Sequence, residues 1–263
     1  MRKLLLTSSA LVAAASISSY AVADVSVTGG FEWAYKSISS NVADTDGDEF
    51  GTDNTVTVSF TNKTDSGLNI TGVYDIDAET GTNDETWLSI AGGFGSIKLG
   101  KDVGANDDFG IGEHDLIDED LSVVPANASI VTTSGEANAV DNNKINYTTP
   151  TMGGFRAGYS IFDSGSEDAA TDQIAMGAEY TMPLAGGSLM IRYNKATDDG
   201  TTTTETEAQN YGAKLTMGAI TAIASRGEST IGSGANQTDD ITADGIGISY
   251  NLGGGMKISA STM

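Results

Sequence analysis

The chain has 263 residues, a formal net charge of −23, 33 glycines, three prolines and no cysteine. The absence of cysteine excludes disulfides, a thiol nucleophile and thiolate metal sites, and the acidic balance disfavours nucleic acid and favours cations as partners. No apolar run after the N-terminus is long enough to predict a transmembrane helix.

The N-terminus has the pattern of an export signal. Arg2 and Lys3 precede an apolar run over 4–17, and the small residues Ala21 and Ala23 provide a cleavage site before Asp24. We therefore expect a signal peptide over 1–23 and an exported domain over 24–263.

From Asp24 onward, thirteen candidate strands alternate apolar and polar residues. In the segments 85–92 and 95–102, Leu88, Ile90, Ile97 and Leu99 share one face, whereas Lys98 lies on the other. Strands with one apolar and one wet face recur along the chain, and no amphipathic helix is available to cover the apolar faces. The facing of the strand over 219–226 stays open.

The connections between these strands alternate between short and long. The short connections are glycine-rich turns, such as 65–67, 93–95 and 184–187, and they join the strands at one end of the predicted sheet. The long, acidic connections run over 37–53, 77–84, 102–141, 163–172, 196–208 and 227–241. This asymmetry predicts an all-β fold, a transmembrane antiparallel β-barrel.

Several aromatic residues near the strand ends fit the interfacial girdles of such a barrel. They are Trp33, Tyr35, Tyr74, Trp87, Tyr147, Tyr180 and Tyr250.

Five segments in order resemble Gram-negative general porins, especially the alphaproteobacterial type. They are DVSVTGGFEWAY, TDSGLNITGVYDID, WLSIAGGFGSIKLGKD, NKINYTTPTMGGFRAGYSIF and GIGISYNLGGGMKISA. The resemblance implies a homotrimeric barrel of about sixteen strands, without cofactor, surrounded by outer-membrane lipid and lipopolysaccharide. It also implies passive diffusion of small hydrophilic solutes across the outer membrane of a Gram-negative bacterium, with the loop after the fifth strand folded into the lumen.

The end of the chain departs from this family pattern. Thirteen strands are fewer than the family barrel has, and the chain ends on Ser261-Thr262-Met263, where these porins normally have a terminal aromatic residue. We therefore expect the C-terminal strands, about three of them, to be missing.

The loop over 102–141 is the expected constriction. Its acidic candidates are Asp107, Asp108, Glu113, Asp115, Asp118, Glu119 and Asp120. The period-two pattern places these basic candidates on the lumen wall: Lys98, Lys144, Arg156, Arg192, Lys214 and Lys257. Acids on the loop facing bases on the wall would set a field across the channel, and the acidic excess predicts mild cation selectivity. The simpler interpretation is that these charges are only solvated.

Other readings remain open. An exported acidic β-rich surface or adhesin module would have no channel, but it would bury its apolar face in a two-layer core. A barrel enzyme would need a Ser–His pair or its equivalent, and the single histidine, His114, has no evident partner. The run Asp44–Asp48 lacks the glycine of a calcium loop, so no metal site is predicted.

Overall fold

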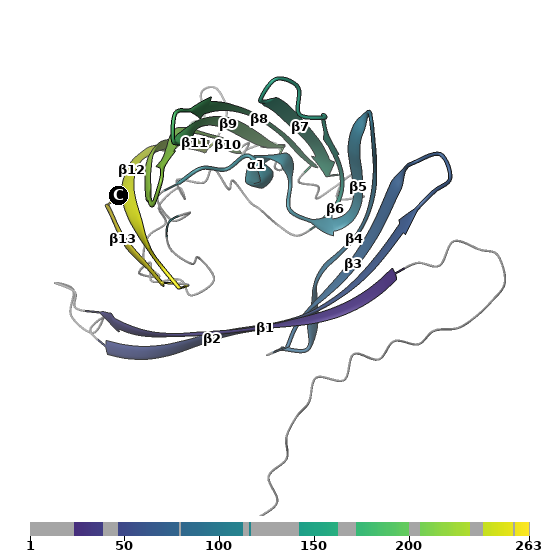
Figure 1. The fold of residues 1–263 in the computed structure, drawn as a ribbon, viewed down its shortest axis with the longest axis horizontal. Helices are drawn as coiled ribbons and strands as arrows, with labels where there is room; N and C mark the ends of the chain where they lie inside the picture. Colours follow the sequence, from purple (N-terminus) through teal and green to yellow (C-terminus); the bar gives the residue numbers. More distant parts are fainter. Residues whose placement is uncertain are drawn as a thin grey trace, which may run out of the picture.

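The computed structural model describes residues 24–38, 47–78, 80–112, 116, 142–162, 172–199, 206–231, 239–254 and 256–262 (Figure 1). The predicted signal peptide and most of the loop over 102–141 lie outside these ranges. Within them, no helix is long and apolar enough to cross a membrane.

The described strands form one antiparallel sheet of thirteen strands, in which each strand pairs with its neighbours in the sequence. The strands are β1 (Asp24–Ile38), β2 (Gly47–Lys63), β3 (Asn69–Asp77), β4 (Thr82–Gly92), β5 (Gly95–Asp102), β6 (Asn142–Thr148), β7 (Phe155–Phe162), β8 (Asp172–Leu184), β9 (Gly187–Asp199), β10 (Thr206–Met217), β11 (Ile220–Ile231), β12 (Asp239–Gly253) and β13 (Met256–Thr262). The predicted all-β antiparallel fold is confirmed. The sheet curls into an incomplete ring, and among the described residues β1 pairs only with β2 and β13 only with β12 (Figure 1).

Tight turns connect the strands at one end of the sheet. Gly67 and Gly186 both have φ of 86° in such turns, a backbone conformation that glycine adopts without steric strain. At the other end, the strands run further than predicted: β2 begins at Gly47 and β11 ends at Ile231. Alternation does not mark these extensions, because their sequences, GDEFGTD over 47–53 and GESTI over 227–231, do not alternate apolar and polar residues.

The two faces of the sheet have the reverse of the burial pattern of a soluble protein. Along β8, the convex side chains Ile174, Met176 and Tyr180 are 41%, 44% and 44% exposed, whereas Gln173 and Glu179 on the concave face are buried. A soluble sheet hides its apolar face. This sheet therefore presents its apolar face to the surroundings and keeps its polar face inside.

The short helix α1 (Ala105–Asp108) lies on the concave side of the arc formed by β6–β11 (Figure 1). It contacts β6, β7, β8 and β9. The fully buried apolar side chains Phe109 and Ile111 follow it directly. The apolar core thus lies between the loop segment and the concave wall, and the predicted site lies there too.

Candidate functional site

The segment over 102–112 leaves β5 and crosses the concave wall strand by strand. The Ala105 amide donates to Ser160 Oγ on β7 at 3.0 Å, and Asn146 Nδ2 on β6 donates to Asp108 Oδ2 at 2.9 Å. Further along, Ser259 Oγ on β13 donates to the Leu116 carbonyl at 2.8 Å. The segment is therefore tied to the wall from β6 to β13.

Two buried asparagines hold the middle of this segment. Asn210 Nδ2 donates to the Ile111 carbonyl at 3.0 Å, and the Ile111 amide donates to Asn210 Oδ1 at 3.2 Å. Asn194 Nδ2 donates to the Phe109 carbonyl and to Asn210 Oδ1, both at 3.2 Å. The Asn210 amide thus pairs with Ile111 as a neighbouring strand would, and it satisfies two backbone groups that the loop removes from water.

The wall beneath the segment is built from small residues. The paired glycines Gly158 and Gly177 lie under Phe109, and Gly212 lies under Ile111. Alanines surround them on the concave face: Ala175, Ala196 and Ala208. Since these positions carry almost no side chain, the loop backbone approaches the sheet closely.

A charged triad lies beside this contact. Glu179 accepts from Arg156 through Nε at 3.2 Å and Nη2 at 2.9 Å, and from Arg192 Nε at 2.8 Å. Arg192 Nη1 also donates to the Gly110 carbonyl at 2.7 Å, and the Arg156 guanidinium lies 4.9 Å from the centre of the Phe109 ring. Two guanidiniums share one carboxylate, so the triad carries a net positive charge.

A second ion pair lies at the start of the segment. Lys98 Nζ is 2.5 Å from Asp102 Oδ2 and 4.8 Å from the centre of the Trp87 ring. Trp87 Nε1 donates to Glu85 at 3.2 Å. The assignment of Trp87 to an interfacial girdle is therefore wrong: its ring shares the concave face with Lys98. Tyr74, Tyr147, Tyr180 and Tyr250 lie on the convex face and are exposed.

The described acids of the predicted constriction are Asp107 and Asp108, both in α1. The other acidic candidates lie outside the described residues: Glu113, Asp115, Asp118, Glu119 and Asp120. Every predicted wall base falls on the concave face by register: Lys98, Lys144, Arg156, Arg192, Lys214 and Lys257.

The bases nearest α1 lie under the loop segment and do not face it across the lumen. Lys144 Nζ donates to the Asp102 carbonyl at 3.1 Å, and Arg192 donates to that of Gly110. These bases donate hydrogen bonds to loop carbonyls, so they hold the loop to the wall in addition to giving the wall positive charge. Among the described residues, no group of acidic and histidine side chains could hold a metal ion.

Sequence reasoning missed the residues that seat the loop: Phe109, Gly158, Gly177, Asn194 and Asn210. The period-two pattern does place Asn194 and Asn210 on the polar face, but it contains nothing that marks them as partners of a loop almost a hundred residues away in the chain. Only the register, which sets Asn194 opposite Asn210 and Gly158 opposite Gly177, brings them together.

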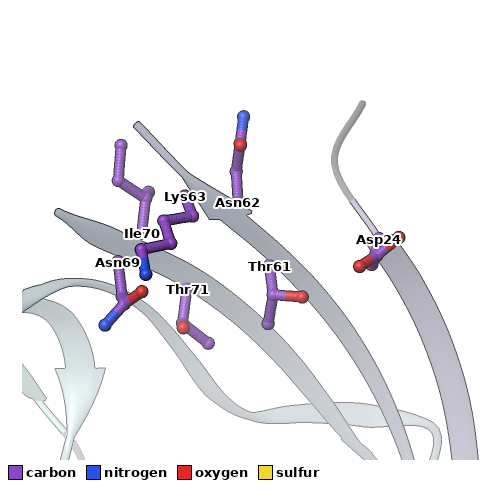
Figure 2. A pocket seen from close by; sticks show the side chains of 7 residues that line it. All are labelled: Asp24, Thr61, Asn62, Lys63, Asn69, Ile70 and Thr71. Carbon is purple, nitrogen blue, oxygen red and sulfur yellow. The ribbon is translucent and has the colours of Figure 1, made fainter. Parts of the chain in front are cut away.

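A hollow of about 540 Å³ lies among β1, β2 and β3 (Figure 2). Its lining residues are Asp24, Thr61, Asn62, Lys63, Asn69, Ile70 and Thr71. Thr61 and Thr71 point to one side of the sheet, and Asn62 and Ile70 to the other (Figure 2). The hollow lies at the turn end of β1, β2 and β3, and α1 contributes nothing to it.

Comparisons with known proteins agree with this architecture. The anion-selective porin from Comamonas acidovorans is 16% identical, with 90% of this chain and 78% of that chain covered and a TM-score of 0.60. A mutant of Rh. blastica porin is 15% identical, with 90% and 93% covered and a TM-score of 0.51. A loop-deletion mutant of OmpT, an outer membrane protein of Vibrio cholerae, is 11% identical, with 91% and 92% covered and a TM-score of 0.53. No curated protein sequence matches this chain.

These likenesses establish the fold, and the exposed apolar face excludes the two-layer core of a secreted surface module. The family model for Gram-negative porins matches residues 7–263, nearly the whole chain. Proteins of this family are channels of the outer membrane rather than enzymes. The chain therefore belongs to the Gram-negative porins and is an outer-membrane β-barrel protein.

Proposed function

We propose that this porin forms a water-filled channel through which small hydrophilic solutes and ions diffuse passively. The observation that carries the proposal is the reversed burial, with apolar side chains outside and Asn, Ser, Lys, Arg and Glu side chains inside. A polar lumen stays hydrated, and a convex apolar face is stable in hydrocarbon.

The segment over 102–112 supports a constriction in this channel. It lies inside the ring, where side chains of four wall strands bind it: Asn146, Ser160, Arg192, Asn194 and Asn210. A fifth strand, β13, binds the chain further along, through Ser259 and the Leu116 carbonyl. Lumen space that the segment occupies is closed to solutes. Loop acids and wall bases then act on whatever passes beside it.

The pairing of the wall bases supports a mild cation preference. Lys98 is paired with Asp102, and both Arg156 and Arg192 are paired with Glu179. These acids offset part of the positive charge of the wall, and the acidic excess of the chain as a whole, formally −23, favours cations in the long-range potential. The anion selectivity stated for the Comamonas acidovorans porin belongs to that protein.

We also propose a homotrimer in outer-membrane lipid and lipopolysaccharide, without cofactor. The exposed convex face supports the lipid contact, and the likeness to porins supports the trimer. Chemical crosslinking of the protein in detergent followed by mass measurement tests the assembly, with three copies expected and a stable monomer contradicting it.

The proposal is tested with liposomes that contain the purified protein. We expect swelling in isotonic solutions of small sugars, at rates that fall smoothly with sugar size and do not saturate with concentration. Reversal potentials in a KCl gradient measure selectivity separately. Swelling that saturates, or that discriminates between sugars of equal size, contradicts passive diffusion.

A further inference from the structure

Phe109 packs tightly against the concave wall. Its side chain is fully buried, and it covers the paired glycines Gly158 and Gly177 on β7 and β8. A Cβ at Gly158 would lie 2.4 Å from Phe109 Cε2, and a Cβ at Gly177 would lie 2.4 Å from Phe109 Cβ. Both separations are far below van der Waals contact, so neither glycine can become alanine unless Phe109 moves.

The loop backbone at and beyond the ring is tied to the wall. Asn194 donates a hydrogen bond to the Phe109 carbonyl, and Arg192 donates one to the Gly110 carbonyl. Asn210 pairs with both backbone groups of Ile111. The Phe109 ring also lies against the Arg156 guanidinium. Since close-packed contacts of this kind transmit displacement, the depth of the ring and the height of the loop above the wall are coupled.

We propose that Gly158 and Gly177 form a seat for Phe109, and that the depth of this seat sets how far the segment over 102–112 projects into the lumen. Phe109 is then a positioning residue for the channel aperture, although it touches no solute. The inference rests on the proposed function, in which the segment narrows the channel.

The two glycines predict different responses to one second substitution. At Gly158 the three nearest atoms all belong to the Phe109 ring, Cε2, Cδ2 and Cζ, and Phe109→Ala removes all three. At Gly177 the nearest atom is Phe109 Cβ, which alanine retains. Phe109→Ala should therefore relieve Gly158→Ala but not Gly177→Ala.

The experiment compares unitary conductances in planar bilayers for the full chain, Gly158→Ala, Gly177→Ala, Phe109→Ala and the two double variants. Gly72→Ala is the matched control, because a Cβ there meets its nearest neighbours at an ordinary 3.9 Å. We expect both seat variants to conduct less than the unmodified channel and Gly72→Ala to conduct equally. In the Phe109→Ala background, Gly158→Ala should have no further effect, whereas Gly177→Ala should still lower the conductance.

Equal conductance in all variants, or identical rescue of both glycine variants, overturns the seat. Should the glycine variants fail to insert, Phe109→Trp enlarges the ring from the loop side and should lower the conductance; an unchanged value overturns the inference. A lack of conductance in the unmodified channel contradicts the proposed function instead, so the two failures are distinguishable.

Discussion

Glu179 controls the charge of the concave wall beside the loop. Its carboxylate binds Arg156 through two contacts and Arg192 through a third, and its side chain is only 10% exposed. Charge-assisted, bidentate contacts of this kind fix both partners in orientation and offset their charge. Without the carboxylate, two neighbouring guanidiniums would face the lumen uncompensated.

Glu179→Gln should therefore shift the reversal potential in a KCl gradient toward anion permeation. Glu228→Gln is the matched control, because Glu228 also accepts from an arginine, Arg226, but on the convex face. It removes the same charge and should leave selectivity unchanged. Equal shifts in the two variants would show that net charge alone sets selectivity and that the wall triad has no special part in it.

Asn210 pairs with the loop backbone through both its donor and its acceptor. It is completely buried, and its amide both donates to and accepts from Ile111. Asn210→Asp preserves the shape but replaces the donor by a carboxylate oxygen facing a carbonyl. A buried carbonyl left without its donor costs about 1–3 kcal/mol.

We expect Asn210→Asp to loosen the loop, which single-channel recordings would register as greater open-channel current noise at similar insertion frequency. Asn251→Asp is the control, since Asn251 is exposed and its side-chain oxygen accepts from the Gly253 amide in a turn. Noise that stays at the level of the unmodified channel would mean that the loop does not depend on this amide.

At the scale of the strands, the convex apolar positions determine stability in lipid. Met176 is convex and exposed, and Thr181 on the same strand is concave. An arginine on the lipid face near the middle of a bilayer costs about 2–4 kcal/mol, whereas an arginine that reaches a wet lumen keeps its hydration.

Met176→Arg should consequently lower the free energy of unfolding from phospholipid vesicles by about 2–4 kcal/mol, and Thr181→Arg should lower it much less. Urea titration followed by tryptophan fluorescence measures both. Equal losses, or a larger loss for Thr181→Arg, would contradict the assignment of the convex face to lipid.

The strands and their order could be predicted from the sequence because each repeats a local, period-two pattern between glycine turns. The strand over 219–226 resisted this reasoning, and β11 shows why: Ile223 faces inward against Ile111 and Leu116, while Arg226 faces outward and pairs with Glu228 and Asp244. Both residues reverse the usual rule for a barrel wall.

The candidate site was less accessible to sequence reasoning than the strands. Alternation places Arg156, Arg192 and Glu179 on the inner face. Nothing in the local sequence shows that both arginines bind the Glu179 carboxylate, or that Arg192 also binds the loop. Trp87 illustrates the limit, because aromatic residues occur both at membrane interfaces and on a lumen wall, and only the contact with Lys98 decides between them.

At the scale of the molecule, the thirteen described strands form a sheet that curls around the segment over 102–112, and small residues of the sheet let that segment approach closely. The apolar side chains of the sheet lie outside, charged side chains such as Glu179 and Arg192 lie inside, and family membership places the protein in the outer membrane. These features together support a passive aqueous channel, and they imply that current through it follows the conductivity of the salt solution.

Single-channel recording of the unmodified protein in planar bilayers tests this most directly. Stepwise, ohmic conductance that rises in proportion to bulk KCl conductivity is the predicted result. Conductance that saturates at low salt would indicate a binding site in place of a water-filled path. A protein that stays soluble and never produces conductance steps would contradict the channel itself.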